Sequence, residues 1–411
     1  MDVRPILTTL RRHKTASALI VLEIALSCAI ICNALFLISG RIDRMNRVSG
    51  LAEDQLVRVQ LTGIGKDDNA AALTASDLAL LRGLPGVKDA TVTNQVPLVS
   101  SSWNSSVTLV KDQHDQTLSS TIYMGDDSFI DSFGLNLVAG RNFTADELVD
   151  WQALQAPNSK VPVPSAIITR SMADKLYPGQ NPLGKTFYSW GDEPIRVVGI
   201  VEHLVRPSEE SGDVGHEYSM ILPIKLDYTA GGNYMIRVAD PARRDEVLKA
   251  AVAALKRNGP SRIVLDDNTK TVEALRDDYY RQDRSMMWLL VAVCIALLVV
   301  TALGIVGLAS FWVQQRTKQI GVRRALGATR GQILRYFQTE NFLLATLGIV
   351  IGMMLAYGIN QLLMGKYELP RLPALYLPIG AVVLWLLGQL AVFGPARRAA
   401  AVPPAVATRT V

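Results

Sequence analysis

One short stretch of the sequence has the residue types of a phosphate-binding loop. GQNPLGKT, residues 179–186, contains two glycines separated by four residues and followed by lysine and threonine. In nucleotide-binding proteins such a loop follows a strand and opens a helix, so that backbone N–H groups cradle phosphate. Here helix-like sequence precedes the loop and strand-like sequence follows it, and Pro182 removes one backbone donor. We therefore interpret the stretch as a turn and expect no cofactor on this chain.

Histidine, serine and cysteine form no pattern that predicts a catalytic or metal site. Only His203 and His216 lie near one another, in an acidic stretch without metal-ligand spacing, which favours a polar surface loop. No G-x-S-x-G nucleophile pattern occurs. Cys28 and Cys32 share a helix face, which leaves metal ligation as an alternative, but they and Cys294 lie in apolar runs, where thiols behave as small hydrophobic groups. We expect no catalytic residue, no metal site and no enzymatic activity.

Four long apolar runs determine the fold class. The chain has 411 residues, of which 49% are hydrophobic, and a net charge of +5. A helix needs about 20 apolar residues to cross the hydrocarbon core of a membrane. We predict spans at residues 16–40, 285–313, 341–363 and 375–394. The first run is longer than the apolar part of a signal peptide and no small-residue cleavage site follows it, so we interpret it as an anchor.

Basic residues near the spans predict the orientation. They concentrate in residues 1–15, which we interpret as an amphipathic segment, in the connection 314–340, and in the tail 395–411. Because basic residues are enriched in cytoplasmic loops, these three segments and both termini are predicted to be cytoplasmic. The large region 41–284 and the short loop 364–374 then lie on the other side of the inner membrane.

Residues 41–284 are long enough for one or two globular domains. VKDATVTNQVPLV and PIRVVGIV read as strands, whereas ASDLALLRGL reads as a helix with Ser76 as a possible N-cap. Residues 240–266 read as a helix, a Gly-Pro turn and a strand. This mixture predicts an extracytoplasmic α+β domain, without disulfides because no cysteine lies in the region. The charged, helix-permissive ends of the region predict stalks that prolong the first two spans.

Two features of the spans themselves indicate helix contacts. Glu23 lies about two turns inside the first span, where an ionisable group is costly unless it faces protein or water, and Asn33 lies at the margin of the same face. We favour helix packing over a transport role for Glu23. Gly348 and Gly352 form a GxxxG pattern, which permits close approach of a neighbouring helix.

The connection 314–340, QQRTKQIGVRRALGATRGQILRYFQTE, is basic throughout and carries no acid until its last residue. Gly321 and Gly327 are expected to interrupt the helix, and Thr329 with Gln332 can form a capping box for the next one. We predict a short helix against the inner membrane face, with Ile333 and Phe337 on one side, followed by a turn into the third span. Charge alone would suffice for lipid binding, so this arrangement favours a docking element for a cytoplasmic protein.

This connection resembles the cytoplasmic loop of the MacB/FtsX-type permeases of ABC transporters. The closing sequence FGPARRAAAVPPAVATR is similar to the end of that family. In the outer region, FGLNLVAGRNFTADE resembles the family's GR-x-F segment, and AIITRSMADKLYPGQNPLGKTF and IRVVGIVEHLVRP resemble the segments after it. The similar segments occur in the expected order over nearly the whole chain.

The resemblance implies a four-span permease that works as a dimer with two ATPase domains, which would bind ATP and Mg. Motion of the ATPases would be transmitted to the stalks and the periplasmic domain, driving export or efflux without a need for cargo to cross the bilayer. The segment between spans two and three would dock on the ATPase. The residues implied in this coupling are Arg316, Arg323, Arg324, Ala325, Leu326, Gly327, Ala328 and Thr329.

Two departures and two alternatives accompany the resemblance. Family members often carry an acid where this chain has Gln319, and MacB-type members carry the ATPase on the same chain, whereas here the first span comes almost at once. We therefore expect a separate ATPase polypeptide. The second permease is an identical or a related chain, and an adaptor and an outer-membrane channel are further expected partners. An FtsX-like regulator that activates an outer partner such as a cell-wall hydrolase is the alternative; a lone anchored receptor would leave the docking segment unexplained.

Overall fold

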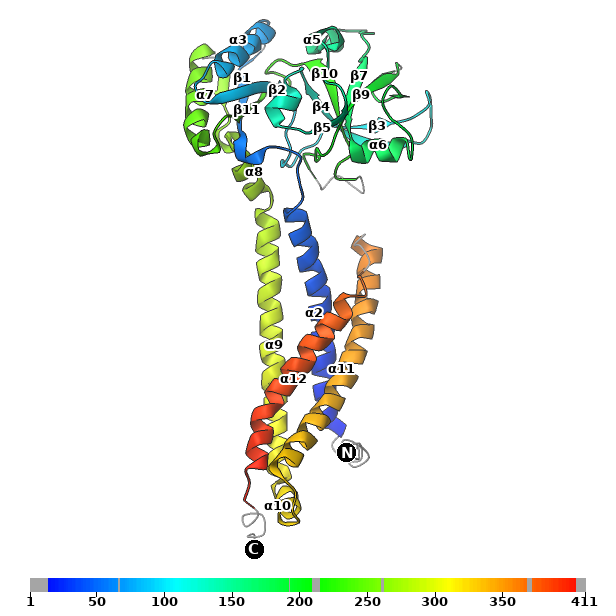
Figure 1. Cartoon of the computed structure of the whole chain (residues 1–411), viewed down its shortest axis with the longest axis vertical. Coiled ribbons are helices and arrows are strands. Elements are labelled where there is room, and N and C mark those ends of the chain that lie inside the picture. Colours follow the sequence, from blue (N-terminus) through cyan, green and yellow to red (C-terminus); the bar gives the residue numbers. More distant parts are fainter. Residues whose placement is uncertain are drawn as a thin grey trace. The chain divides into compact units, whose positions relative to one another are not determined.

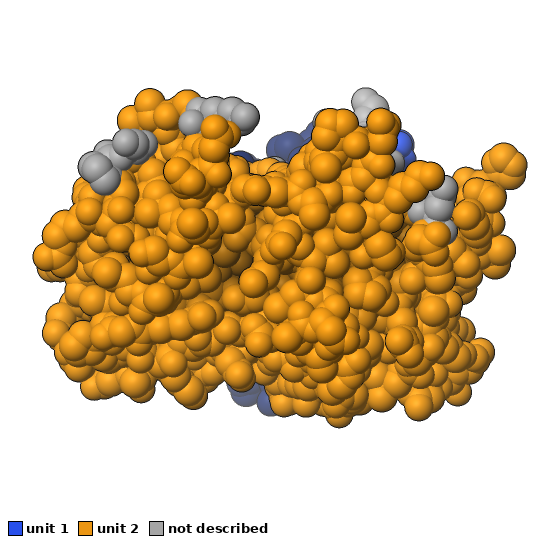
Figure 2. All heavy atoms as spheres, turned by 90° about the horizontal axis from the view of Figure 1, so that it is seen from above, with its two compact units in different colours: residues 1–46, 282–411 blue, residues 47–281 orange. Residues whose placement is uncertain are grey.

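A computed structural model describes residues 14–403 apart from residues 66, 192, 209–214, 260–261 and 368–371. The chain divides into two compact units, residues 1–46 with 282–411, called unit 1, and residues 47–281, called unit 2 (Figure 2, blue and orange). The predicted segments 1–15, 364–374 and 395–411 lie partly outside the described residues. Each unit is described by itself.

Among its described residues, unit 1 contains four helices that are long and apolar enough to cross a membrane, one for each of the four predicted apolar runs (Figure 1). α2 and α9 continue beyond their apolar runs into charged sequence, where Arg41 and Asp283 form an ion pair. These extensions correspond to the predicted stalks. The bounds of the four helices are α2 Lys14–Met45, α9 Arg281–Gln315, α11 Arg330–Tyr367 and α12 Tyr376–Ala400.

The connection between α9 and α11 differs from the prediction in two ways. The short helix is α10, Thr317–Ala325, and Gly321 lies buried inside it without interrupting it. The helix that follows Thr329 makes no turn into the third span, because α11 runs without interruption from Arg330 to Tyr367. The expected short helix followed by a turn was therefore wrong: the helix breaks at Arg316, between α9 and α10, and again at Gly327, whose φ is 96°.

Unit 2 is built on two sheets and belongs to the predicted α+β class. The first sheet has the strand order β12-β1-β11-β2, with β13 on the edge of β1, and all its pairs are antiparallel. The helices of this part are α3, α7 and α8 (Figure 1). The bounds are β1 Leu56–Gly63, α3 Ala70–Arg82, β2 Val87–Thr93, β11 Asn233–Val238, α7 Arg244–Asn258, β12 Arg262–Val264, β13 Lys270–Thr271 and α8 Val272–Tyr279.

The second sheet is mixed, with the order β3-β4-β10-β7-β9-β5; β6 pairs with β10 and β8 with β9. Its central strands β4, β10, β7 and β9 are almost wholly buried, and β10 and β9 are mainly Ile, Val, Met and Leu, whereas β4 and β7 also bury serine and threonine. The bounds are β3 Asn104–Val107, β4 Leu118–Gly125, α4 Phe129–Phe133, β5 Leu137–Gly140, β6 Val149–Asp150, α5 Trp151–Gln155, β7 Ser165–Thr169, α6 Arg170–Leu176, β8 Thr186–Phe187, β9 Ile195–Val201 and β10 Ser219–Lys225.

Several local predictions for unit 2 can be compared with these bounds. β9 and the order of the helix α7 and the strand β12 agree with the predictions, while the predicted Gly-Pro turn between them lies partly outside the described residues. The stretch 179–186 lies between α6 and β9, which is the turn context that we expected. The proposed N-cap Ser76 was wrong: α3 begins at Ala70, so Ser76 lies inside the helix, where its side chain meets Asn258 of α7.

The segment around Arg141, which contains the GR-x-F sequence, forms a turn that packs against the second sheet. Gly140 has a φ of 77°, and a β-carbon there would collide with the Val198 carbonyl oxygen of β9. Both terminal nitrogens of Arg141 donate to the carboxylate of Glu147, at 2.7 and 2.8 Å. Phe143 is buried. The glycine, the arginine and the phenylalanine therefore hold one turn against the second sheet.

Glu147 gives unit 2 a predicted sensitivity to acid. Its hydrogen bonds with Arg141 lower the pKa of Glu147 to about 2, below its ordinary value of 4.5. Since the folded-state pKa is depressed, the stabilisation is complete above about pH 4.5 and is lost as the pH falls towards 2. Because Arg141 is half exposed, we expect Glu147→Gln to lower the stability of unit 2 by about 1 kcal/mol at neutral pH.

The measurement is urea unfolding of the full chain in detergent, followed by hydrogen exchange of residues 137–150 between pH 7 and pH 3. The difference between wild type and Glu147→Gln should shrink as the pH falls. Glu246→Gln, which breaks the exposed pair with Arg243, is the control and should differ little from the wild type at any pH, because an exposed pair contributes little stability. A difference that stays constant across this pH range would contradict the assignment.

Candidate functional site

The connection between α9 and α11, residues 316–329, forms a bend that we call the elbow. Two local structures determine its geometry, the C-terminus of α10 and the N-terminal cap of α11. At the end of α10 the N–H groups of Gly327 and Ala328 donate to the carbonyls of Arg324 and Arg323, at 3.1 and 3.0 Å. This is the pattern of a helix end closed by a left-handed glycine. Thr329 then caps α11: its N–H donates to Gln332 Oε1 at 2.9 Å, and Gln332 N–H donates to Thr329 Oγ1 at 3.3 Å. The predicted capping pair is present.

A small apolar cluster holds the elbow from one side. Ile320 of α10 packs with Ile333 and Phe337 of α11, and all three are buried. The same cluster includes Ala396, Ala399 and Ala400 at the end of α12. Small alanine side chains let α12 approach closely, and Arg324 donates to the carbonyl of Ala400. The elbow is therefore a supported element, fixed to the ends of two long helices.

The other side of the elbow is left open. Leu326, directly before Gly327, is 83% exposed, and Val322 one turn earlier is 49% exposed. The guanidinium of Arg323 lies over the Tyr336 ring of α11, 5.2 Å from its centroid. The tip of this supported turn therefore carries a large apolar side chain that is mostly exposed.

A buried ion pair lies where α9 meets the elbow. Arg316 Nη1 donates to both carboxylate oxygens of Glu340 at 3.0 and 2.9 Å, and the two side chains are only 9% and 2% exposed. The guanidinium also lies over the Trp312 ring. Arg316 thus joins the end of α9 to α11. The sequence reasoning named Arg316 but missed Glu340, although Glu340 is the only acid of residues 314–340 and so the only local partner.

A cavity of about 310 Å³ lies between α10 and α11, beside this ion pair. Its walls combine apolar side chains with guanidinium and amide donors, and Gln319 is among them. It could therefore accept a carboxylate or carbonyl group. The lining residues are Arg316, Gln319, Ile320, Arg323, Ala328, Gln332, Ile333, Tyr336 and Phe337.

The polar residues of α2 lie at helix contacts. Glu23 lies against α9, where a β-carbon on Gly304 would come within 2.6 Å of its Oε1. Ser27 Oγ and Thr301 Oγ1 are 2.8 Å apart, and Asn33 Nδ2 donates to the Ala356 carbonyl of α11 at 3.2 Å. Sequence reasoning found the polar side chains on α2 but not their partners, because a small residue such as Gly304 carries no chemical signal.

Gly348 and Gly352 of α11 face α2. A β-carbon on Gly348 would lie 2.9 Å from both the Ile24 side chain and the Val21 carbonyl oxygen. A β-carbon on Gly352 would lie 2.7 Å from the Ala25 carbonyl oxygen. Even a methyl group at these positions would displace α2 from α11. The elbow, the ion pair and this close helix contact therefore belong to one packed bundle.

Two family models match the chain. The MacB-like periplasmic core domain matches residues 17–254, and the FtsX-like permease C-terminal model matches residues 291–404. The first covers more than half of the 411 residues, and the second covers α10, α11 and α12.

Two relatives and one solved structure are similar to long parts of the chain. The chain is 26% identical over 412 residues to the macrolide export ATP-binding/permease protein MacB of Acinetobacter baylyi, covering 98% of this chain but only 58% of that protein. It is 23% identical over 364 residues to the uncharacterized ABC transporter permease YknZ of Bacillus subtilis, covering 84% of this chain and 82% of that one. A crystal structure of the periplasmic region of MacB from Actinobacillus actinomycetemcomitans covers 57% of this chain and 95% of that one, at 16% identity and a TM-score of 0.34.

Proposed function

Because this chain belongs to the family of ABC transporter permeases with a MacB-like periplasmic core domain and an FtsX-like permease region, we propose that it couples ATP hydrolysis by an ABC ATPase to movement of its outer domain, driving export. Unit 1 would lie in the inner membrane with both termini cytoplasmic, and unit 2 would lie outside. Two copies, or this chain and a related one, would act together. Relatives named as export proteins support export over regulation.

The observation that carries this proposal is the elbow. Its tip exposes Leu326 and Val322 while Ile320, Ile333 and Phe337 anchor its other side to the bundle. A contact that must transmit force needs both features, an exposed surface for the partner and a stiff connection to the moving helices. Arg316, through Glu340, would make the connection to α9, and the residues from Arg323 to Thr329 would meet the ATPase.

A double substitution tests the contact. We expect Arg323→Glu with Leu326→Asp to reduce recovery of the ATPase with the affinity-purified chain by about tenfold or more. The first substitution reverses a charge of the proposed interface, and the second replaces its exposed apolar side chain by an acid. Leu326 is 83% exposed, so the bundle should be unaffected. The measurement is quantitative mass spectrometry of complexes purified from membranes in mild detergent.

The control is Arg335→Glu, which reverses an exposed charge on α11 outside the elbow and should leave recovery unchanged. Equal ATPase recovery from the double variant and the wild type would contradict the docking role. The identity of the companions separates the functions. An ATPase with an adaptor and a channel supports export, an ATPase with only a cell-wall enzyme supports the regulatory alternative, and no ATPase contradicts both.

A further inference from the structure

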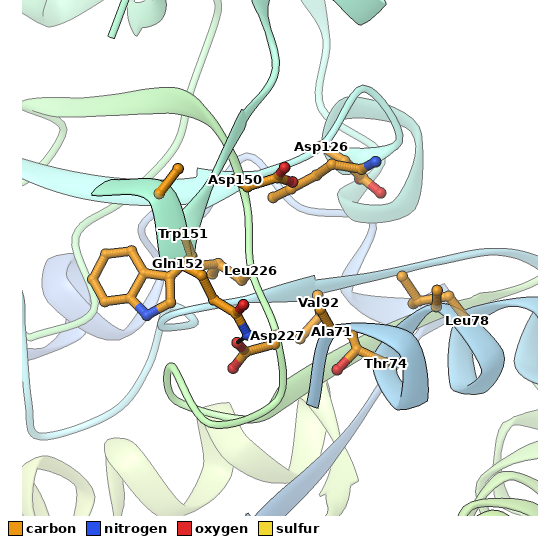
Figure 3. A pocket seen from close by; sticks show the side chains of 13 residues that line it. Ala71, Thr74, Leu78, Val92, Asp126, Asp150, Trp151, Gln152, Leu226 and Asp227 are labelled. Atoms are coloured by element: carbon orange, nitrogen blue, oxygen red, sulfur yellow. Dashed lines mark hydrogen bonds between the residues drawn. The ribbon is translucent and has the colours of Figure 1, made fainter. Parts of the chain in front are cut away.

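Unit 2 contains a cavity that plays no part in the proposed coupling. Its volume is about 430 Å³, within the range of pockets that hold small ligands. It lies between α3 and the segment formed by β6 and α5, beside the end of β10 (Figure 3). Trp151 and Gln152 of α5 form one wall, and Thr74 and Leu78 of α3 lie opposite them. The cavity therefore bridges the two sheets of unit 2.

A second cavity of about 590 Å³ adjoins the first, since Trp151, Gln152 and Asp227 line both. The charge of this combined site is strongly one-sided. Among its described lining residues the only cation is Lys225, whereas five are aspartates. These are Asp67, Asp68, Asp126, Asp150 and Asp227.

Asp227 is the most informative of these acids because it is buried without a counter-charge. The residue is only 4% exposed. Its carboxylate accepts hydrogen bonds from Gln152 Nε2 at 3.2 Å and from the Thr229 N–H at 2.9 Å, and also from the Thr229 hydroxyl. All three donors are neutral, and no Lys, Arg or His among the described residues pairs with it. A buried carboxylate compensated only by neutral donors is stabilised further when a cation arrives.

Apolar surface lies beside the acids. Leu78, Val92 and Leu226 line the first cavity together with the indole of Trp151. Trp151 also contacts two other tryptophans, Trp103 and Trp190, whose ring centroids each lie 6.3 Å from its own. An indole fixed in this way offers a flat apolar face, which attracts organic cations more strongly than other aromatic rings do.

Asp126, on the opposite side of the cavity, gives independent support. Its side chain is 16% exposed, accepts hydrogen bonds from Thr91 at 2.8 Å and from the Ser128 N–H at 3.1 Å, and forms an ion pair with Arg82 at 3.7 Å. Burial raises the pKa of Asp126, which indicates that its negative charge is incompletely compensated. Two sides of the cavity thus carry carboxylates that would gain from positive charge in the space between them.

We propose that this cavity binds a small amphipathic organic cation, with its ammonium or guanidinium group at Asp227 and its apolar part against Trp151, Leu78 and Val92. Positive charge would compensate a carboxylate that the fold leaves with neutral donors only, and the apolar part would cover the indole. The inference does not rest on the proposed coupling, because every residue that it uses lies in unit 2.

The test is calorimetric titration of the purified full chain with phenylalanyl-arginine amide. The reference ligand is N-acetyl-phenylalanyl-glutamine amide, which has a similar shape without the charges. We expect the cationic dipeptide to bind saturably and the neutral one to bind at least tenfold more weakly. Asp227→Asn, which keeps the side-chain shape, should weaken the cationic ligand by about tenfold or more.

Two further variants keep the result interpretable. Asp150→Asn changes an exposed lining residue, so it does not endanger the fold, and it should weaken binding by a smaller factor. Asp174→Asn removes an exposed acid of α6 outside the cavity and should leave binding unchanged. Comparing variants in the same detergent removes any contribution from binding to micelles. Absence of saturable binding at millimolar concentration, equal binding of both dipeptides, or equal weakening by Asp174→Asn would each overturn the proposal.

Discussion

Glu340→Ala is expected to destabilise unit 1 by about 3–5 kcal/mol, because it leaves the guanidinium of Arg316 buried without its counter-charge. The pair is almost wholly buried, and Arg316 Nη2 already has no hydrogen-bond partner among the described residues. Loss of the carboxylate therefore leaves no acceptor for the charge in its present position. The end of α9 should separate from α11, so the elbow should lose its connection to the second span.

The measurement is the thermal midpoint of the full chain in detergent, followed by size-exclusion chromatography after heating. The informative comparison is the double variant Arg316→Met with Glu340→Leu, which replaces the pair by apolar side chains and should be much more stable than Glu340→Ala. Arg335→Ala, on the exposed face of α11, should change stability by less than about 0.5 kcal/mol. If Glu340→Ala and the double variant unfold at the same temperature, the charge is not what makes the residue important.

The parts of the fold that could be predicted are those that a local pattern determines. The four long helices follow from apolar runs too long for a soluble domain. The cap at Thr329 needs only two residues three positions apart, and the break at Gly327 needs only one residue that adopts a positive φ. Gly321 shows the limit of this reasoning, because a glycine inside a helix costs about 1 kcal/mol, which packing of α10 against α11 can offset.

The partners of the site could not be predicted in the same way. Arg316 was named from the sequence, but its pairing with Glu340 depends on α11 continuing through residue 340 as one helix, whereas a turn was expected there. Glu23 meets Gly304, and the GxxxG pair meets α2, through contacts between helices far apart in the sequence. Such contacts depend on how each helix is rotated about its own axis in the bundle. Because these helices are apolar on all sides, the sequence does not show which side of each helix faces its neighbours.

The cavity of unit 2 was even harder to predict from the sequence than the partners of the elbow. Asp227 follows β10, Trp151 begins α5, and Leu78 lies on α3, so three separate elements must come together before the site exists. None of these residues belongs to a motif. What could have been noticed is that WQALQ follows Asp150 and is followed by Ala156 and Pro157, which places a tryptophan at the start of a short helix. That pattern alone does not distinguish a ligand wall from core packing.

Asp77→Ala is the substitution expected to do most damage in unit 2. Asp77 is fully buried and forms an ion pair with Arg262, itself only 2% exposed. The carboxylate also accepts from the Tyr234 hydroxyl at 2.6 Å and from Asn258 Nδ2 at 2.8 Å. One side chain of α3 thus satisfies donors from β11, from the end of α7 and from β12. Its removal leaves the buried charge of Arg262 without its counter-charge and takes an acceptor away from Tyr234 and Asn258.

We expect Asp77→Ala to cost unit 2 about 3–5 kcal/mol, the range found when one partner of a buried ion pair is removed. Hydrogen exchange of the full chain should report this locally, with faster exchange in α3, β12 and the end of α7, and no change in the second sheet beyond that of the wild type. Asp174→Ala, at an exposed position of α6, is the matched control and should leave exchange unchanged.

A second variant distinguishes the loss of the Asp77 charge from the loss of its side-chain volume. Asp77→Asn keeps the volume and can still accept from Tyr234, but it cannot neutralise Arg262, so it should lose most of the stability that Asp77→Ala loses. If Asp77→Asn behaves like the wild type, hydrogen bonding rather than charge holds α3 to β12. If both variants behave like the wild type, the network does not support this sheet. The cavity proposed above depends on that support, because Thr74 and Leu78, which line it, lie on α3 next to Asp77.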